Sequence, residues 1–155
     1  MSDLATGMAA PDFDLATDGG ARVSLSALKG KTVIVYFYPK DDTPGCTKEA
    51  IAFSGLAAEF EAIGAIVIGI SPDSAEKHDK FKAKHNLTVR LAADPDTTTA
   101  QAYGVWVEKN MYGKKYMGVE RATFLVKADG TIAQIWRKVK VPGHADAVLA
   151  AAKDL

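Results

Sequence analysis

"KTVIVYFYPKDDTPGCTKEAIAFSGLAAEFEAIGAIVIGIS" covers residues 31–71 and contains two short apolar runs on either side of a longer segment with helical spacing. The runs Lys31–Lys40 and Ala65–Ser71 are rich in β-branched and aromatic residues and are too short for helices. They are almost continuously apolar, which is typical of strands covered on both faces. Between them, the side chains with helical spacing are Ile51, Phe53, Leu56, Phe60 and Ile63. The pattern predicts a strand, one helix ending at Gly64, and a second strand in a right-handed crossover.

The remaining sequence adds further helices and strands to this unit. A charged helix capped at Asp73 or Ser74 is expected to run to about Asn86, followed by a short strand. Two β-rich runs flank residues 128–130, where Asp-Gly is typical of a tight hairpin turn, and a smaller hairpin is predicted around residues 18–20. We therefore expect an α/β fold with a mixed central sheet flanked by helices and an N-terminal β-hairpin. A thioredoxin-like fold fits this order, with residues 1–155 as a single domain.

Composition narrows the class of protein. The 155 residues include 19 basic and 19 acidic side chains, so no net charge favours nucleic acid or an anionic membrane. The N-terminus lacks a basic start followed by an apolar run, and no window is apolar enough for a membrane span, so we expect a cytoplasmic protein. The single cysteine excludes an internal disulfide and a C-x-x-C motif.

That cysteine, Cys46, lies at the predicted start of the helix. There, the helix dipole and the free backbone N–H groups favour a thiolate, which is the nucleophilic form. Pro44 and Gly45 add little bulk before it, and Thr43 can turn a hydroxyl toward the same space. The alternative is an inert cysteine packed as a small hydrophobic residue. The polar residues around it favour a reactive, accessible thiol over a core side chain.

Other candidate sites have weaker support. His78 and His85 are seven residues apart on the charged helix, but no third ligand lies nearby, so we expect surface histidines and no metal. The aromatic residues between Tyr103 and Tyr116 are expected to be core or a loop near the site, since the neutral chain argues against binding nucleic acid. No nucleotide-binding motif is present, and we expect no cofactor.

Four segments resemble one family. "PKDDTPGCTKEA" is similar to the active-site loop of peroxiredoxins, whose Pro-x-x-x-Thr-x-x-Cys pattern is met by Pro39, Thr43 and Cys46. The segments "APDFDL", "GISPDS" and "MYGKKYMGVERATFLVKADGTIAQIWRKVKVPGH" resemble the Q-type subfamily, also called bacterioferritin comigratory protein. The resemblance covers nearly the whole chain. It implies a thioredoxin fold and thiol-dependent reduction of hydrogen peroxide and organic hydroperoxides.

The resemblance also implies residue roles. Cys46 would be the peroxidatic cysteine, which attacks the O–O bond and becomes a sulfenic acid. Thr43 would hydrogen-bond the peroxide, and Pro39, together with Pro44 and Gly45, would shape its pocket. Arg121 would favour the thiolate and stabilise the leaving oxygen; without the resemblance, a solvated arginine at a strand end would be the preferred interpretation. Glu49 is a weaker candidate for orienting this arginine, because acidic residues are common in first helical turns.

The chain departs from many Q-type members at Ile51, five residues after Cys46, where they carry a resolving cysteine. We therefore expect a 1-Cys mechanism with an external thiol such as thioredoxin or glutaredoxin. The helix is expected to stay folded on oxidation, and the protein to be a monomer or weak homodimer. Two alternatives remain open: a peroxide sensor that passes oxidation to a client protein, and a non-catalytic binding module.

Overall fold

A five-stranded mixed sheet forms the centre of the computed structural model, which describes residues 4–155. The strand order is β5-β4-β3-β8-β9. The strands are β3 (Thr32–Phe37), β4 (Ala65–Ser71), β5 (Arg90–Ala93), β8 (Ala122–Val126) and β9 (Ile132–Trp136). β3 pairs in parallel with β4 and antiparallel with β8, so the crossover and the later hairpin meet on the central strand. The expected α/β fold with a mixed sheet is confirmed.

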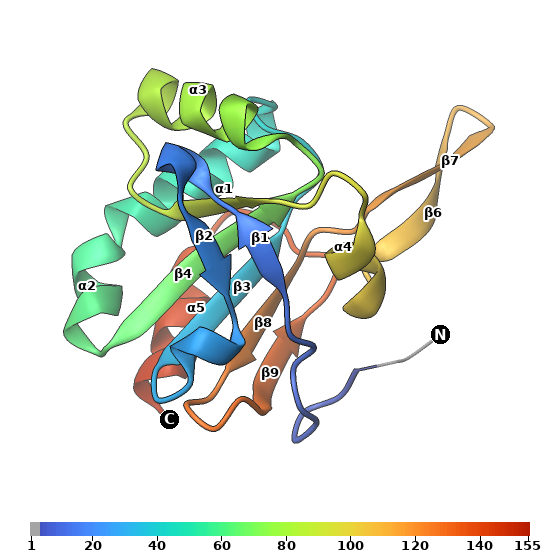
Figure 1. Ribbon diagram of the computed structural model, residues 1–155. Coiled ribbons are helices and arrows are strands. Elements are labelled where there is room, and N and C mark those ends of the chain that lie inside the picture. Colours follow the sequence, from blue (N-terminus) through green and yellow to red (C-terminus); the bar gives the residue numbers. More distant parts are fainter. Residues whose placement is uncertain (1–3) are drawn as a thin grey trace.

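Helices cover both faces of this sheet, as Figure 1 shows. One face is covered by α1 (Pro44–Gly55), α2 (Ala57–Ala62), α3 (Ala75–His85) and α5 (His144–Lys153). The other is covered by α4 (Thr98–Ala102) and the expected N-terminal hairpin of β1 (Asp14–Ala16) and β2 (Arg22–Ser24). Short 3-10 turns, η1 (Asp18–Gly20) and η2 (Ser26–Leu28), follow β1 and β2. This is the thioredoxin-like arrangement that the sequence predicts.

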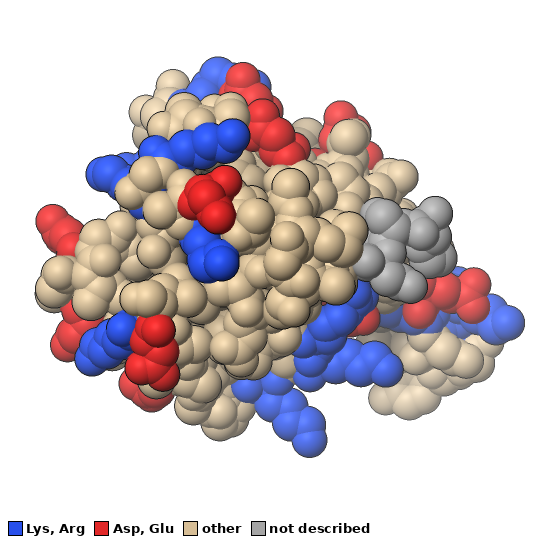
Figure 2. All heavy atoms as spheres, turned by 90° about the horizontal axis from the view of Figure 1, so that it is seen from below, with Lys and Arg blue, Asp and Glu red and all other residues tan. Residues whose placement is uncertain are grey.

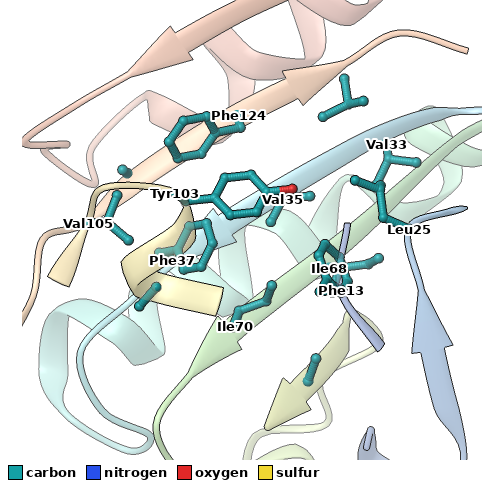
Figure 3. Close-up of a cluster of buried hydrophobic side chains, with 14 of the residues drawn as sticks. Phe13, Leu25, Val33, Val35, Phe37, Ile68, Ile70, Tyr103, Val105 and Phe124 are labelled. Carbon is teal, nitrogen blue, oxygen red and sulfur yellow. The ribbon is translucent and has the colours of Figure 1, made fainter. Parts of the chain in front are cut away.

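Strand β3 supplies side chains to two separate cores because successive residues point to opposite faces. Val33, Val35 and Phe37 pack on the α4 side, where Figure 3 shows Phe37, Tyr103 and Phe124 close together. The rings of Tyr103 and Phe124 are edge to face at 5.0 Å, a geometry that stabilises aromatic pairs. Ile34 and Tyr36 point to the face covered by α1, α2, α3 and α5, which also holds Cys46.

The single predicted helix over residues 46–64 is in fact two helices. α1 ends at Gly55, and Leu56, with φ −103° and ψ 10°, separates it from α2. The Ser54 hydroxyl accepts a hydrogen bond from the Thr88 N–H at 3.0 Å, which ties this break to the segment before β5. Ile51, one of the apolar side chains with helical spacing, is 48% exposed because the inner face of α1 is formed by Cys46, Ala50 and Phe53.

The aromatic segment after α4 forms a hairpin that the sequence did not predict. β6 (Trp106–Met111) and β7 (Lys114–Val119) pair antiparallel across Tyr112 and Gly113, both at positive φ, as tight hairpin turns require. Tyr112 is fully exposed at the tip of this hairpin, which extends away from the sheet in Figure 1. Tyr103, in contrast, is fully buried, as expected for a core aromatic residue.

The surface carries both signs of charge. On the face shown in Figure 2, Lys and Arg side chains stand close to Asp and Glu side chains at several points. Within residues 4–155, no helix is long and apolar enough to cross a membrane.

Candidate active site

Helix α1 begins at the loop that follows β3, and this start places Cys46. Thr43 is the N-cap residue, and the Thr47 N–H donates to its carbonyl at 2.8 Å, which closes the first helical turn. Pro44 occupies the first helical position, where its fixed φ is suitable and its missing N–H costs nothing. Gly45 and Cys46 follow, and backbone N–H groups at these positions have no acceptor inside a helix. They are therefore donors for a negatively charged oxygen.

Cys46 itself is buried, with 2% of its surface exposed. The expectation of an accessible thiol was wrong, because the polar residues beside Cys46 in sequence are not its neighbours in space. In an α-helix, residues three, four and seven apart share one face, and Glu49, Ala50 and Phe53 are the buried residues that share this face with Cys46. The sulfur therefore lies at the inner edge of the helix and still faces a polar group.

That polar group is Arg121, which directly precedes β8. Its Nη2 donates to the Cys46 sulfur at 3.3 Å, and its Nη1 donates to Glu49 Oε1 at 2.7 Å. Pairing of β8 with β3 brings the arginine here from 75 residues further along the chain. The alternative of a solvated strand-end arginine is wrong for this structure. A guanidinium at this distance stabilises a thiolate over a thiol.

Glu49 is the buried partner of this arginine. Its side chain is 1% exposed, and burial raises its pKa from 4.5 to about 7, although the Arg121 charge acts in the opposite direction. Its second oxygen, Oε2, has no hydrogen-bond partner among the described residues. The structure places Glu49 beyond the first turn of α1, so the alternative of an ordinary first-turn acidic residue is wrong, and its contact with Arg121 is the one that the sequence expectation named.

The other predicted site residues lie in the same loop. Gly45 lies under the guanidinium: a Cβ at this position would lie 3.2 Å from Arg121 Nη2. The Thr43 hydroxyl donates to the Lys40 carbonyl at 2.9 Å. The lone pairs of its oxygen therefore stay available to accept a hydrogen bond from another group. Pro39 follows the buried Tyr38 and is half-buried, and Pro44 is exposed.

Sequence reasoning missed a second set of residues that hold this loop. His78, expected at the surface, is fully buried on α3, with Nδ1 2.6 Å from Asp41 Oδ2 and Nε2 3.0 Å from the Ala92 carbonyl. The Tyr38 hydroxyl donates to the other Asp41 oxygen at 2.5 Å. The seven-residue spacing of His78 and His85 places them on one face of α3, but it does not reveal that the carboxylates of residues 41 and 42 lie opposite that face. Residues 4–155 contain no group of three or more metal-ligating side chains.

A thioredoxin-like sheet with a buried thiol at a helix start, next to an arginine, defines a thiol redox protein. The AhpC/TSA family matches residues 6–135, and the chain belongs to this family. It is 49% identical to peroxiredoxin Bcp of Bacillus subtilis, over 96% of this chain and 95% of that protein. It is 48% identical to peroxiredoxin Bcp of Xanthomonas campestris, over 99% of this chain and 97% of that protein.

Solved structures agree with this membership. The chain superposes on X. campestris bacterioferritin comigratory protein, studied for its alkyl peroxide reduction activity, with a TM-score of 0.88. The two are 48% identical, with 92% of this chain and 90% of that chain covered. Structures of X. campestris peroxiredoxin Q include variants with serine in place of one or the other of two cysteines, whereas the present chain has one cysteine. The resemblance to the Q-type subfamily is confirmed.

Proposed function

We propose that the protein is a thiol-dependent peroxidase that reduces hydrogen peroxide and organic hydroperoxides at Cys46 by a 1-Cys mechanism. The observation that carries the proposal is the 3.3 Å contact between Arg121 Nη2 and the Cys46 sulfur, at a helix start, in a chain of this family. The contact of Arg121 with Glu49 directs its second guanidinium nitrogen at the sulfur. A site of this kind supplies both an activated nucleophile and donors for the developing negative charge.

The oxidation step involves one bond exchange. The Cys46 thiolate attacks one peroxide oxygen, the O–O bond breaks, and the sulfur becomes a sulfenic acid. The peroxide is reduced to water or an alcohol when the leaving oxygen takes a proton from solvent. We assign to Arg121 and the free N–H groups of Gly45 and Cys46 the stabilisation of that oxygen, and to the Thr43 hydroxyl oxygen the acceptance of a hydrogen bond from the peroxide O–H. In this proposal Pro39 and Pro44 shape the approach to the sulfur, and Glu49 orients Arg121.

Regeneration requires a second molecule because the chain has no second cysteine. An external thiol attacks the sulfenic acid, water leaves, and a mixed disulfide forms; a further thiol then releases reduced Cys46. A thioredoxin or glutaredoxin is the class of reductant that we propose, in the cytoplasm, where thiol pools stay reduced. We propose a monomer or weak homodimer as the working form. The exposed Ile51 places an apolar side chain where many Q-type members have a resolving cysteine.

The test is hydrogen peroxide consumption with excess dithiothreitol by the wild type and by Cys46→Ser. The wild type should consume many equivalents and the serine variant none. Consumption of one equivalent by the wild type would favour a peroxide sensor over an enzyme. If the wild type consumed none and its thiol resisted alkylation, the protein would be a binding module, and the proposal would be wrong.

A further inference from the structure

The β6–β7 hairpin has two faces with different chemistry. In an antiparallel pair, residues directly opposite one another share a face, and successive residues of a strand alternate between faces. The register pairs Lys109 with Tyr116 and Met111 with Lys114. We call the face that holds these residues the lysine face, and it consists of Val107, Lys109, Met111, Lys114, Tyr116 and Gly118. Its charged side chains are lysines, and it carries no carboxylate.

The opposite face of the hairpin carries both signs of charge. Glu108 and Lys115 lie on it, with Lys115 Nζ 3.9 Å from Glu108 Oε1. Met117, directly across from Glu108, adds an exposed apolar side chain. This face therefore has a lysine and an apolar residue that match Lys114 and Tyr116 in position and exposure but lack an excess of positive charge.

The hairpin leads directly into the active site. β7 ends at Val119, and only Glu120 separates it from Arg121. The Glu120 N–H donates to the Val105 carbonyl at 2.7 Å, which holds the two ends of the hairpin together next to the arginine. The hairpin therefore extends from the residue that contacts the Cys46 sulfur.

Lys109 shows that the lysine face borders the site. Its half-buried side chain lies across Gly118, where a Cβ would be 3.2 Å from Lys109 Cδ. Burial, and then the Arg121 charge, lowers the pKa of Lys109, whereas the charges of Cys46 and Glu120 raise it. Charge interactions of this kind act between groups that lie close together. The Lys109 ammonium is therefore a second cation near the arginine and the sulfur.

Exposed apolar side chains accompany these lysines. Met111 and Tyr116 are exposed on the lysine face, and Tyr112 is fully exposed at the tip of the hairpin. Tyrosine and methionine are enriched at protein interfaces, and a group of exposed apolar side chains marks an interaction surface. The hairpin extends away from the sheet, so a partner can reach this face (Figure 1).

The charge of the lysine face limits which partner fits it. A second copy of this chain in a symmetric contact would bring the same lysines to the same place, and like charges oppose such a contact. A protein with carboxylates around an apolar centre is complementary to the face. With one cysteine in the chain, an external thiol must reach Cys46, and Arg121 beside it is 17% exposed. A thiol protein that docks on the lysine face is therefore placed next to this arginine.

We propose that the lysine face of the β6–β7 hairpin is the docking surface for the reducing protein, a thioredoxin-class protein whose thiol is surrounded by acidic and apolar side chains. The inference rests on the proposed function and identifies the surface that its reductant uses. Lys109 and Lys114 attract the acidic groups, and Met111 and Tyr116 supply the apolar contact. Docking adds no chemical step to the reduction described above.

The test compares matched variants on the two faces. Lys114→Glu and Tyr116→Ala change the lysine face, and Lys115→Glu and Met117→Ala change the opposite face. All four residues are exposed, so none of these variants removes core packing. The measured quantity is the rate constant for reduction of oxidised Cys46 by thioredoxin, divided by the rate constant for its reduction by dithiothreitol. Dithiothreitol is a small thiol that needs no docking surface.

This ratio should fall about tenfold in Lys114→Glu and in Tyr116→Ala, because a reversed charge slows association and a truncated aromatic side chain loses contact area. It should stay within about twofold of the wild type in the two variants of the opposite face. The rate of the wild type with thioredoxin should also fall as salt is added, since salt screens the attraction. Equal ratios for the two faces, or a thioredoxin rate independent of salt, would overturn the proposal.

A binding measurement tests the docking surface even if the proposed peroxidase activity is absent. Thioredoxin is titrated into Cys46→Ser, and NMR amide shifts record where it binds. The shifts should concentrate on residues 107–118, and adding Lys114→Glu should raise the Kd about tenfold. Absence of binding, binding elsewhere, or a homodimer that Tyr116→Ala dissociates would overturn the docking surface. Absence of peroxide turnover alone would overturn only the proposed function.

Discussion

Gly45 leaves room for the arginine that faces the sulfur. An alanine Cβ would lie 3.2 Å from Arg121 Nη2, the nitrogen that donates to the sulfur, so the guanidinium must move by a few tenths of an ångström. We expect Gly45→Ala to lower the second-order rate constant for hydrogen peroxide by about tenfold, because a small misplacement of a catalytic group is costly. Gly55→Ala is the matched control: it is in the same helix, and nothing lies within 4 Å of its Cβ. Equal rates for both variants would contradict the role given to Gly45.

Glu49 makes stability depend on pH. Burial raises its pKa from 4.5 to about 7, so the folded protein holds a proton that the unfolded chain has already lost. The free energy of unfolding should therefore fall as pH rises from 4.5 to about 7. Glu49→Gln cannot ionise, so its free energy of unfolding should rise relative to that of the wild type by up to about 3 kcal/mol across this pH range. Urea unfolding at pH 5 and pH 8 measures this difference in stability. The exposed Glu59→Gln is the control for a lost charge. A difference between Glu49→Gln and the wild type that did not depend on pH would contradict the prediction.

The burial and the contacts of individual side chains were the features that the sequence predicted least completely. The position of Cys46 at a helix start follows from local spacing, but its burial does not, because the neighbours that cover it come from other elements. Arg121 could be placed beside Cys46 only by resemblance, since no spacing rule joins residues 75 positions apart. His78 was wrongly expected at the surface: a polar side chain on a charged helix gives no sign of a buried carboxylate partner in a distant loop.

Helix α5 is joined to the sheet by a histidine. His144 Nε2 lies 2.8 Å from the Thr123 hydroxyl of β8, and its ring meets the rings of Phe53 and Trp136 edge to face. Burial, and then the Arg121 charge, lowers its pKa from 6.5 to about 4. The unfolded chain therefore gains a proton first on acidification, and stability is lost as pH falls from 6.5 toward 4.

We expect His144→Gln, which can still bond Thr123 but cannot gain a proton, to lose less stability than the wild type over this range. Urea midpoints at pH 6.5 and pH 4.5 measure the effect. If the two proteins lose stability equally on acidification, His144 does not control how α5 is held. His85→Gln serves as a control for removing an imidazole, because the His85 ring is partly exposed and contacts Asp42 and Phe81 instead of α5.

Elements with strong periodicity or a Gly-containing turn were predicted well. The crossover strands, α3 and the hairpin around residues 128–130 all have such local signals. The β6–β7 hairpin was missed because its turn places Tyr112 at φ 53°, a conformation that its side chain does not suggest. The break between α1 and α2 at Leu56 was missed because it accompanies a hydrogen bond from the Thr88 N–H to the Ser54 hydroxyl. The local sequence does not show this bond.

For the whole molecule, a single cysteine fixes the end product of oxidation. With peroxide in excess and no thiol present, a Cys46 sulfenic acid has no internal partner, so a second peroxide converts it to a sulfinic acid. Intact mass measurement should show the gain of two oxygen atoms in the wild type and none in Cys46→Ser. Dithiothreitol added first should prevent the gain. A wild type that stops at one added oxygen under excess peroxide would contradict this prediction.

The long separation between Cys46 and Arg121 also matters while the chain is being made. The arginine follows the cysteine by 75 residues, and synthesis adds about 5–20 residues per second, so the nascent thiol waits about 4–15 s for its partner. β8, which carries the arginine to the site, can pair with β3 only after that interval. A ribosome-bound chain thus has a cysteine without the group that promotes its attack on peroxide. The thiol therefore acquires its activating contact only when the fold that uses it is complete.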